Sequence, residues 1–326
     1  MFIYRLSKAP ALHNPRKMFK MASMDHLKKE QLKGQGAVLL TAFLWSTSGM
    51  FIKMVGWHPM VIASSRSLLA ALFLLAMRLI FPPGGRGAKP SQQINKPSQR
   101  IKMSLPLWLG AICYALTMIS FIAANRTTTA ANAIMLQYSA PVWAALLGWF
   151  LIKERPHWEQ WGAMALVFTG LVLFLRDGLG SGAILGDTIA VFSGIVFGAS
   201  SVFLRMLKDD NPADAMLLAH IICTIAGIPF FFLYPPELTA PEVLPVIYMG
   251  LIQIGLASFV YSYGIKKITA VQAMLTAIME PVLNPVWVLL VFGERPSLTA
   301  LLGGALIITA VIASSLVAMR RSRTSK

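Results

Sequence analysis

Charged residues are scarce in this sequence, and the acidic ones are the scarcest. Only 13% of its 326 residues are charged, with 13 Asp and Glu against 29 Lys and Arg. Soluble domains usually carry about 25% charged residues, whereas hydrophobic residues make up 56% of this chain. The composition therefore excludes an ordinary soluble domain and favours a protein that lies largely within a lipid bilayer.

Cysteines and enzyme motifs are also nearly absent. The two cysteines, Cys113 and Cys223, both lie in apolar runs, so they predict neither a disulfide framework nor a metal cluster. The sequence has no P-loop, no His-Glu-x-x-His and no Gly-x-Ser-x-Gly. We therefore expect no enzyme, no ATP-driven pump, and neither a metal nor a cofactor.

The net charge of +16 is not the signature of a nucleic-acid-binding protein, because the basic residues cluster between hydrophobic runs. The expected partners are a small-molecule substrate and the lipid bilayer, with no nucleic acid. The sequence leaves a homodimer open.

Apolar runs of about 20 residues recur along the chain, and each is long enough to cross a bilayer core of about 30 Å as a helix. The predicted fold class is an all-α polytopic membrane protein with ten transmembrane helices. The predicted spans are 34–55, 58–81, 105–124, 128–152, 157–175, 183–207, 212–234, 241–265, 268–292 and 297–319. The one long connection, 82–104, is rich in Pro, Gly, Ser and Lys and is predicted to be a flexible polar loop.

Lysine and arginine predict the orientation of these spans. With the N-terminus inside, 24 of these residues fall on the inner side and 4 on the outer side. Positive charge is enriched in cytoplasmic loops, so both termini are predicted to be cytoplasmic in a multi-pass protein of the inner (plasma) membrane. Residues 1–33 lack the apolar core of a signal peptide and are expected to be a basic cytoplasmic tail, with disorder as one alternative. Residues 320–326 form a second basic cytoplasmic tail.

The sequence repeats itself at an offset of 140 residues. Gly110 matches Gly250, Pro141 matches Pro281, and the triplet Glu-Arg-Pro occurs at both 154–156 and 294–296. The repeat unit is five helices, 34–175 and 183–319. Because five is odd, the second copy enters the membrane inverted. Inverted repeats are typical of secondary transporters, whose substrates bind near the bilayer midplane where the repeats meet.

Several segments carry a family resemblance across residues 36–318: "LWSTSGMFIK", "SSRSLLAALF", "AANAIMLQYSAPVWAALLGWFLIKERP" and "AVQAMLTAIMEPVLNPVWVLLVFGERP". With them the chain resembles the EamA-type family of the drug/metabolite transporter superfamily, which are ten-helix permeases made of two five-helix repeats. The resemblance implies transport of amino acids, other small metabolites or toxic compounds, and it does not select among these substrates.

Glu280 is the most informative residue of the ninth span. It lies on one slowly turning polar stripe with Gln272, Thr276 and Asn284, at steps of four residues. A carboxylate at the centre of a span costs roughly 2.5–3.5 kcal/mol. Two roles are open: a structural group bonded to a neighbouring helix, and a residue lining the substrate path that changes protonation during transport.

Two basic side chains also lie inside spans. Arg66 in the second span is a candidate partner for Glu280, a candidate ligand for a substrate carboxylate, or a side chain that extends to the outer interface. His220 in the seventh span is either a proton relay or a hydrogen-bonded packing residue.

Four aromatic residues lie within spans rather than at the interfaces, where Trp and Tyr usually collect. Their depth is compatible with stacking on a flat or apolar substrate, and ordinary helix packing is the alternative for each. They are Trp45, Tyr114, Tyr138 and Trp143; of these Trp45, Tyr114 and Tyr138 join Glu280, Asn284, Thr276, Arg66 and His220 as candidate substrate-binding residues.

Prolines inside the fourth and ninth spans remove backbone donors. Pro141, Pro281 and Pro285 are candidate hinges, and static kinks are the alternative. Glu154 and Glu294 end their spans and are expected to be caps or ion pairs.

The sequence as a whole favours a secondary transporter of small metabolites working by alternating access, with export as the expected direction. A membrane receptor or scaffold with the same fold is the alternative.

Overall fold

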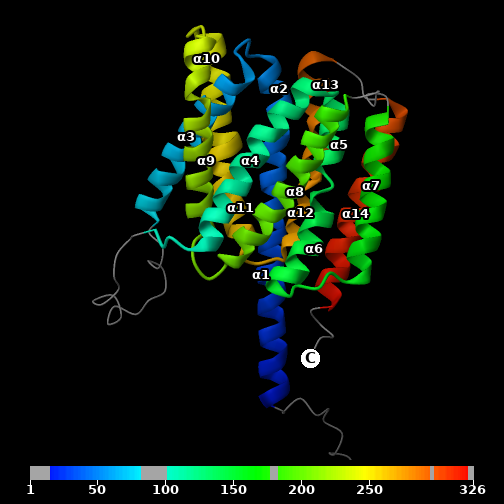
Figure 1. Ribbon diagram of the computed structural model, residues 1–326. Coiled ribbons are helices and arrows are strands. Elements are labelled where there is room, and N and C mark those ends of the chain that lie inside the picture. The colour runs from blue at the N-terminus through cyan, green and yellow to red at the C-terminus, as the bar shows by residue number, and fades with distance from the viewer. Residues whose placement is uncertain (1–14, 82–100, 177–182, 294–296, 322–326) are drawn as a thin grey trace, which may run out of the picture.

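The structure is a computed structural model that describes residues 15–81, 101–176, 183–293 and 297–321. Within those ranges it is a helical bundle in which ten stretches are long and apolar enough to cross a membrane (Figure 1). The first repeat contains α1 Pro15–Ser46, α2 Ser48–Lys53, α3 Pro59–Ile80, α4 Leu105–Thr127, α5 Ala130–Gln137, α6 Ala140–Ile152 and α7 Trp158–Leu175. The second contains α8 Ile184–Met206, α9 Pro212–Leu233, α10 Ala240–Tyr248, the π-helix η3 Met249–Leu256, α11 Ala257–Ile265, α12 Ala270–Ala277, α13 Met279–Phe292 and α14 Leu298–Arg321. The predicted fold class is confirmed.

Helix α1 is longer than predicted. It begins at Pro15 rather than at residue 34, and its first part projects beyond the bundle (Figure 1). Residues 15–33 consist mainly of Lys, Met, Leu, Glu, Gln and Ala, which are good helix formers, and Pro15 occupies a first-turn position where its missing N–H costs nothing. Residues 1–14 of the predicted tail, most of the 82–104 loop and residues 322–326 lie outside the described residues.

The two repeats interlock rather than lie side by side as separate bodies. The most extensive packing joins helices from different repeats: α4 against α8 and α9, α3 against α9, and α7 against α14. The largest hydrophobic core likewise draws on both halves, from Trp45 and Tyr114 to Tyr261 and Met274. Residues near the centre of the bundle are therefore held by both repeats.

The fourth and ninth spans are each divided into two helices at equivalent places. The first break lies at Tyr138 and Ser139, between α5 and α6, and the second lies at Ile278, between α12 and α13. Each break is followed closely by a proline, Pro141 or Pro281. A proline lacks the N–H of the helical bond, and its ring clashes with the carbonyl four residues earlier. The sequence singled out these prolines as candidate hinges or kinks, but it treated each span as one helix.

Not every proline of these spans coincides with a helix break. Residue 285 lies inside α13, which continues to Phe292 without interruption. Beside the first break, helix α8 approaches unusually closely. A Cβ on Gly194 would lie 2.6 Å from Ser139 Oγ, and one on Gly198 would lie 2.6 Å from the carbonyl of Ala140. Glycine is thus required at these two positions of α8.

The eighth span also differs from the expected regular helix, because η3 is wound as a π-helix. A Cβ on Gly250 would lie 2.5 Å from Cβ of Leu69. The backbone of the π-helix therefore approaches α3 closely at this glycine. Short π segments in α-helices are frequent at functional sites. Here the π segment carries Gln253, which is buried at 3% exposure.

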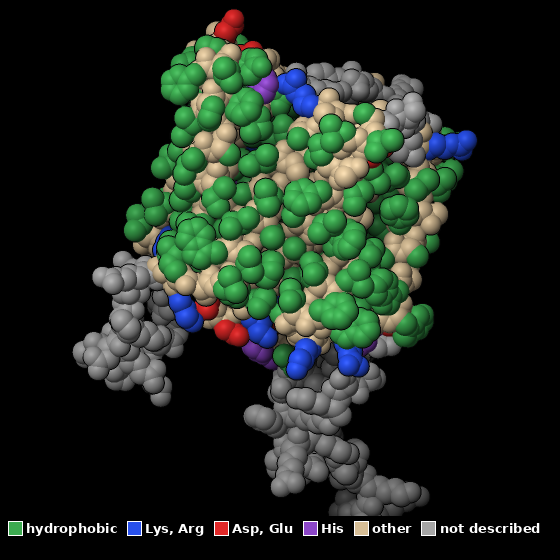
Figure 2. Space-filling view, viewed as in Figure 1, with side chains coloured by type: hydrophobic (Ala, Val, Ile, Leu, Met, Phe, Trp, Pro, Cys, Tyr) green, Lys and Arg blue, Asp and Glu red, His purple; other side chains and the backbone are tan. Residues whose placement is uncertain are grey.

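The bundle has two distinct ends. At the end where α1 projects and α14 finishes, contacts join Lys102 to Asp210, Lys267 to Glu30, and Arg205 to Glu154. We call this the terminus end. At the opposite end, the Gly56 amide donates to the Glu242 carboxylate, and the Trp57 indole donates to the carbonyl of Glu237. Figure 2 shows that hydrophobic side chains cover the visible face of the bundle between the two ends, as expected for a surface in contact with lipid.

Candidate functional site

A cavity of about 510 Å³ lies between the two repeats and runs inward from the end opposite the termini. We call it the central cavity. Its outer part includes Ile52 of α2, and Asn125 and Arg126 at the end of α4, which are exposed. Its inner part includes Arg66, Glu280 and Phe197. Helices of both repeats thus meet around one cavity, whose largely apolar wall carries a few polar and charged side chains.

Arg66 of α3 lines the central cavity. Its Nε is buried without a hydrogen-bond partner, and across the described residues its guanidinium forms no ion pair and donates no hydrogen bond. A guanidinium has five N–H donors and no acceptor, so its hydrogen-bond partners must be acceptors such as carboxylate, phosphate or carbonyl oxygens. The side chain is therefore placed to receive an anionic group.

Glu280 of α13 faces the same cavity. Its Oε2 accepts a hydrogen bond of 2.8 Å from the hydroxyl of Tyr138. Both residues sit at the helix breaks, one in each repeat. Glu280 and Arg66 line the same cavity, and no ion pair joins them. A carboxyl group and a guanidinium are thus both presented to one cavity.

Three further predicted residues lie in the cavity wall, and two do not. Asn284, Trp45 and Tyr114 line the cavity with Arg66, Glu280 and Tyr138. Thr276 is 5% exposed and donates its hydroxyl hydrogen bond to the carbonyl of Gln272 in its own helix.

His220 lies behind the cavity wall. It is fully buried, its Nε2 is 3.1 Å from Ser258 Oγ, and its ring meets Tyr114 edge-on at 5.8 Å between centroids. Of the predicted aromatic residues, Trp143 donates to Ser139 Oγ at 3.2 Å and does not line the central cavity. These placements favour packing over substrate contact for His220 and Trp143.

Two glutamines of the wall were not singled out by the sequence. Gln253 on the π-helix donates to the carbonyl of Trp45 at 3.3 Å, and its Oε1 is buried without a partner. Gln137, the last residue of α5, donates to Ser193 at 3.0 Å. The signal available beforehand was an amide side chain within an apolar span, which is the kind of polar residue that bonds across transmembrane helices.

The cavity is closed toward the terminus end by successive layers. Trp45 packs against Phe197 and Tyr261 at its floor, with ring centroids 6.3 and 5.6 Å apart. Below them, Ser201 Oγ and Tyr261 Oη lie 3.1 Å apart.

The last layer is an ion pair with additional bonds. Arg205 Nε donates to Glu154 Oε1 at 3.0 Å, and Arg205 also bonds the carbonyls of Ile265 and Lys266. Glu154 is therefore an ion-pair residue, one of the two roles open for it, whereas Glu294 lies outside the described residues. The arrangement is open at one end and sealed at the other.

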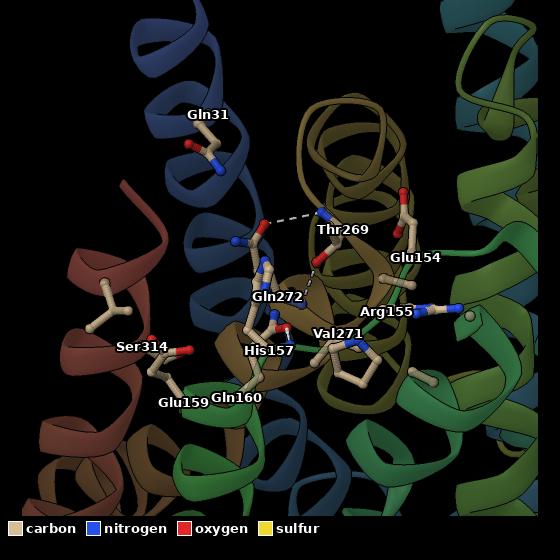
Figure 3. A pocket seen from close by; sticks show the side chains of 15 residues that line it. Gln31, Glu154, Arg155, His157, Glu159, Gln160, Thr269, Val271, Gln272 and Ser314 are labelled. Atoms are coloured by element: carbon tan, nitrogen blue, oxygen red, sulfur yellow. Dashed lines mark hydrogen bonds between the residues drawn. The ribbon is translucent and has the colours of Figure 1, made fainter. Parts of the chain in front are cut away.

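A second polar pocket, of about 200 Å³, lies beyond this seal at the terminus end (Figure 3). We call it the terminal pocket. Thr269 and Gln272 form a capping box at the start of α12 and face the pocket, with Glu159 and Ser314 on another wall. Gln272 belongs to the same stripe as Glu280. The stripe therefore runs from the terminal pocket, past buried Thr276, to the central cavity.

Within the part of the chain that the structure describes, no group of His, Cys, Asp and Glu is arranged to hold a metal ion. Cys113 and Cys223 are free thiols.

The ten spans found among the described residues, two interlocked inverted repeats and a cavity with charged side chains at their junction define a multi-pass membrane protein with the architecture of secondary transporters. The EamA-like transporter family matches residues 32–176 and 184–316, and the chain belongs to this family. The predicted resemblance is confirmed.

Named relatives support the same class. An "Uncharacterized transporter" of Archaeoglobus fulgidus is 27% identical over 86% of this chain and 95% of its own length. An "S-adenosylmethionine uptake transporter" of Rickettsia felis is 22% identical over 93% of this chain and 100% of its own length. A solved crystal structure with 20% identity has a TM-score of 0.70 over 90% of this chain and 98% of its own. That likeness concerns the fold.

Proposed function

We propose that the protein is a secondary transporter that carries small zwitterionic metabolites, of the amino-acid class, across the inner membrane. Transport proceeds by alternating access, in the direction of export, and both termini lie in the cytoplasm. The observation that carries the proposal is the presence of Arg66 and Glu280 in one cavity, each facing it without an ion pair between them.

Charge explains why these two residues indicate a zwitterion. A guanidinium binds a carboxylate through two parallel hydrogen bonds, and Glu280 in its charged form attracts an ammonium group. A substrate carrying both groups would satisfy both side chains and would enter with no net charge. A purely anionic or cationic ligand would leave one buried charge without a partner, which is costly in a low-dielectric site.

The remaining wall supports a small, partly apolar ligand. Trp45, Phe121 and Phe197 offer aromatic surface, and Asn284 and Gln253 offer amide groups. The volume of about 510 Å³ falls within the range of about 300–1,000 Å³ that is usual for small-molecule sites.

Counterflow in proteoliposomes tests the substrate class. Vesicles preloaded with one unlabelled amino acid should accumulate the same labelled amino acid transiently, and an acidic or basic analogue of similar size should compete poorly. Arg66→Met is the matched inactive variant. If wild-type counterflow does not exceed that of Arg66→Met for any amino acid, the zwitterion proposal is overturned.

Alternating access is supported by the arrangement of the two pockets along one stripe. Thr276 is bonded within its own helix. The Glu154–Arg205 pair is largely buried, with side chains 25% and 13% exposed, and it joins the end of the fourth span to the end of α8. Opening the path at the terminus end would require this pair to separate. In the proposed cycle the terminal pocket becomes the inner mouth of the path.

Single cysteines at both ends of the stripe test this cycle. In a cysteine-free variant, Asn284→Cys should react with a methanethiosulfonate reagent added from the outer side, and Gln272→Cys with the reagent added from the cytoplasmic side. Glu154→Gln should raise the reactivity at 272 and lower it at 284, because it weakens the inner seal. Parallel changes at both positions would contradict alternating access.

The direction of transport has its own test. The relative from Rickettsia felis is named as an uptake transporter, which favours import as the second candidate. Cells loaded with a growth-inhibiting amino-acid analogue should survive better when this protein is expressed, if it exports. Greater sensitivity to the externally added analogue would instead support import.

A further inference from the structure

A basic groove lies at the terminus end, beside the terminal pocket, with which it shares Gln31. It has a volume of about 670 Å³ and is bounded by α1, the α8–α9 connection and the end of α11. Three of its lining residues are lysines, Lys208, Lys266 and Lys267, against one carboxylate, Glu30. The groove therefore carries an excess of positive charge.

The three lysines differ in how they are held. Lys267 pairs with Glu30 and lies 4.5 Å from the centroid of the Tyr263 ring, and Lys266 donates to the carbonyl of Asp210 at 2.9 Å. Lys208 is exposed, and no described side chain pairs with its ammonium group. The groove thus combines two positioned cations with one that is available for a ligand.

The setting of the groove is the boundary between the lipid-facing wall and the polar end of the molecule. Tyr263 is 46% exposed and Leu27 is 56% exposed, so apolar surface borders the lysines. Tyrosine at such a level is typical of the membrane interface. In Figure 1 the projecting part of α1 leaves the bundle at this end, and Figure 2 shows lysine and arginine side chains along the same lower rim.

We propose that this groove binds the phosphate headgroup of an anionic phospholipid, with Lys208 and Lys266 as its principal ligands. Basic pockets beside transmembrane helices on the cytoplasmic side bind anionic headgroups, and the exposed apolar rim suits the adjoining glycerol and acyl chain. The volume exceeds what inorganic phosphate needs and accommodates a glycerophosphate group. Burial also lowers the pKa of Lys267, and a nearby phosphate would offset this desolvation of its ammonium group.

Native mass spectrometry of the detergent-solubilised full chain tests the proposal directly. With phosphatidylglycerol and phosphatidylcholine present at equal concentration, phosphatidylglycerol adducts should predominate. Lys208→Gln and Lys266→Gln should each lower phosphatidylglycerol affinity about 5-fold, as expected for one basic residue at an anionic surface. Lys208→Arg keeps the charge and should retain binding.

Matched controls separate the groove from general charge. Lys153→Gln removes one exposed positive charge at the same end but outside the groove, and it should leave phosphatidylglycerol affinity unchanged within about 2-fold. Thermal unfolding of each variant checks that it is folded. Equal retention of the two lipids, or equal loss in Lys153→Gln and Lys208→Gln, would overturn the proposal.

Adding inorganic phosphate distinguishes binding of a lipid phosphate headgroup from binding of a soluble phosphate ion. If millimolar phosphate stabilises the wild type but not Lys208→Gln, and phosphatidylglycerol adducts do not depend on Lys208, then the groove is a site for a soluble anion and the lipid assignment is wrong. If phosphate has no effect and the lipid adducts depend on Lys208, the lipid assignment stands.

Discussion

Tyr138 donates a 2.8 Å hydrogen bond to Glu280 across the junction of the two repeats. Each residue lies at the break of its own divided span, α5–α6 or α12–α13. The bond therefore links the two points where backbone regularity is lost, and it does so inside the central cavity. Any rearrangement that moves one repeat against the other changes this contact.

Removal of the Tyr138 hydroxyl should weaken the junction. Tyr138→Phe eliminates the donor and leaves Glu280 without its described hydrogen-bond partner, and a hydrogen bond to a charged group contributes about 1.5–3 kcal/mol. Thermal unfolding in detergent should show a lower Tm than for the wild type. Tyr263→Phe, which removes an exposed hydroxyl, is the control. In the double variant with Glu280→Gln, the two effects should not add, because the residues share one contact.

Glu280 is expected to couple transport to protons. Glu280→Gln keeps the size and most of the hydrogen bonding but cannot titrate. The variant should fold and still exchange substrate, with weaker affinity because a neutral amide attracts the ammonium group less than a carboxylate does, and it should lose the acceleration that an imposed pH gradient produces in the wild type. A wild type without any response to the gradient would remove the proton role, and failure of the Gln variant to fold would instead support a structural role.

Arg66 is expected to hold the carboxylate of the substrate. Arg66→Lys keeps the charge but loses the two-pronged geometry. Loss of one charge-assisted hydrogen bond, worth about 1.5–3 kcal/mol, should weaken substrate affinity about 10- to 100-fold. Arg66→Met should abolish transport while the protein still reaches the membrane. Normal counterflow by Arg66→Met would exclude the residue from the site.

Membrane orientation is testable by labelling. In a variant with Cys113→Ala and Cys223→Ala, single cysteines are placed by Ser91→Cys and Thr239→Cys. An impermeant maleimide added to intact cells should label position 239 and not position 91, because the charge distribution puts 82–104 inside and 235–240 outside. The reverse pattern would invert the orientation.

His58 should make stability depend on pH. It precedes α3, and its Nδ1 accepts a hydrogen bond from the Met60 amide at 3.3 Å, which requires the neutral ring. Burial and, secondarily, Arg126 lower its pKa below the usual value. The unfolded chain therefore binds the proton more tightly than the folded one. Stability is fully present above about pH 6.5, the usual histidine pKa, and declines as the pH falls below it.

The measurement is Tm between pH 7.5 and 5 in detergent, a window chosen around the ordinary histidine pKa of about 6.5. His58→Asn retains a good N-cap side chain but does not titrate, so its Tm should fall less over this range. Equal pH dependence in the two proteins would assign the effect to other groups.

Composition and repetition allowed the class of fold to be predicted from the sequence. A bilayer core of fixed thickness requires apolar stretches of about 20 residues, and these are visible in one dimension. The match of Pro141 with Pro281 located the symmetric helix irregularities, because proline acts locally on the backbone. Glu280 and Arg66 could be singled out for a similar reason, since an ionisable residue within an apolar span is conspicuous by itself.

The extension of α1 to Pro15 follows from local helix propensity, which the search for apolar runs ignored. Other features depended on contacts between distant segments. Gln253 reaches the cavity because η3 is wound as a π-helix against α3, and Thr276 is excluded from it because neighbouring helices cover it. Both depend on packing at the repeat junction.

The sequence alone determined that this chain crosses the membrane many times as two inverted copies of one unit, because hydrophobic length and residue identity are properties of the chain itself. Only the tertiary structure decided which polar residues share the central cavity, which end of it is sealed, and that Tyr138 is the partner of Glu280. Those outcomes depend on how two five-helix units interlock, and the distances between residues more than a hundred positions apart are set by that packing.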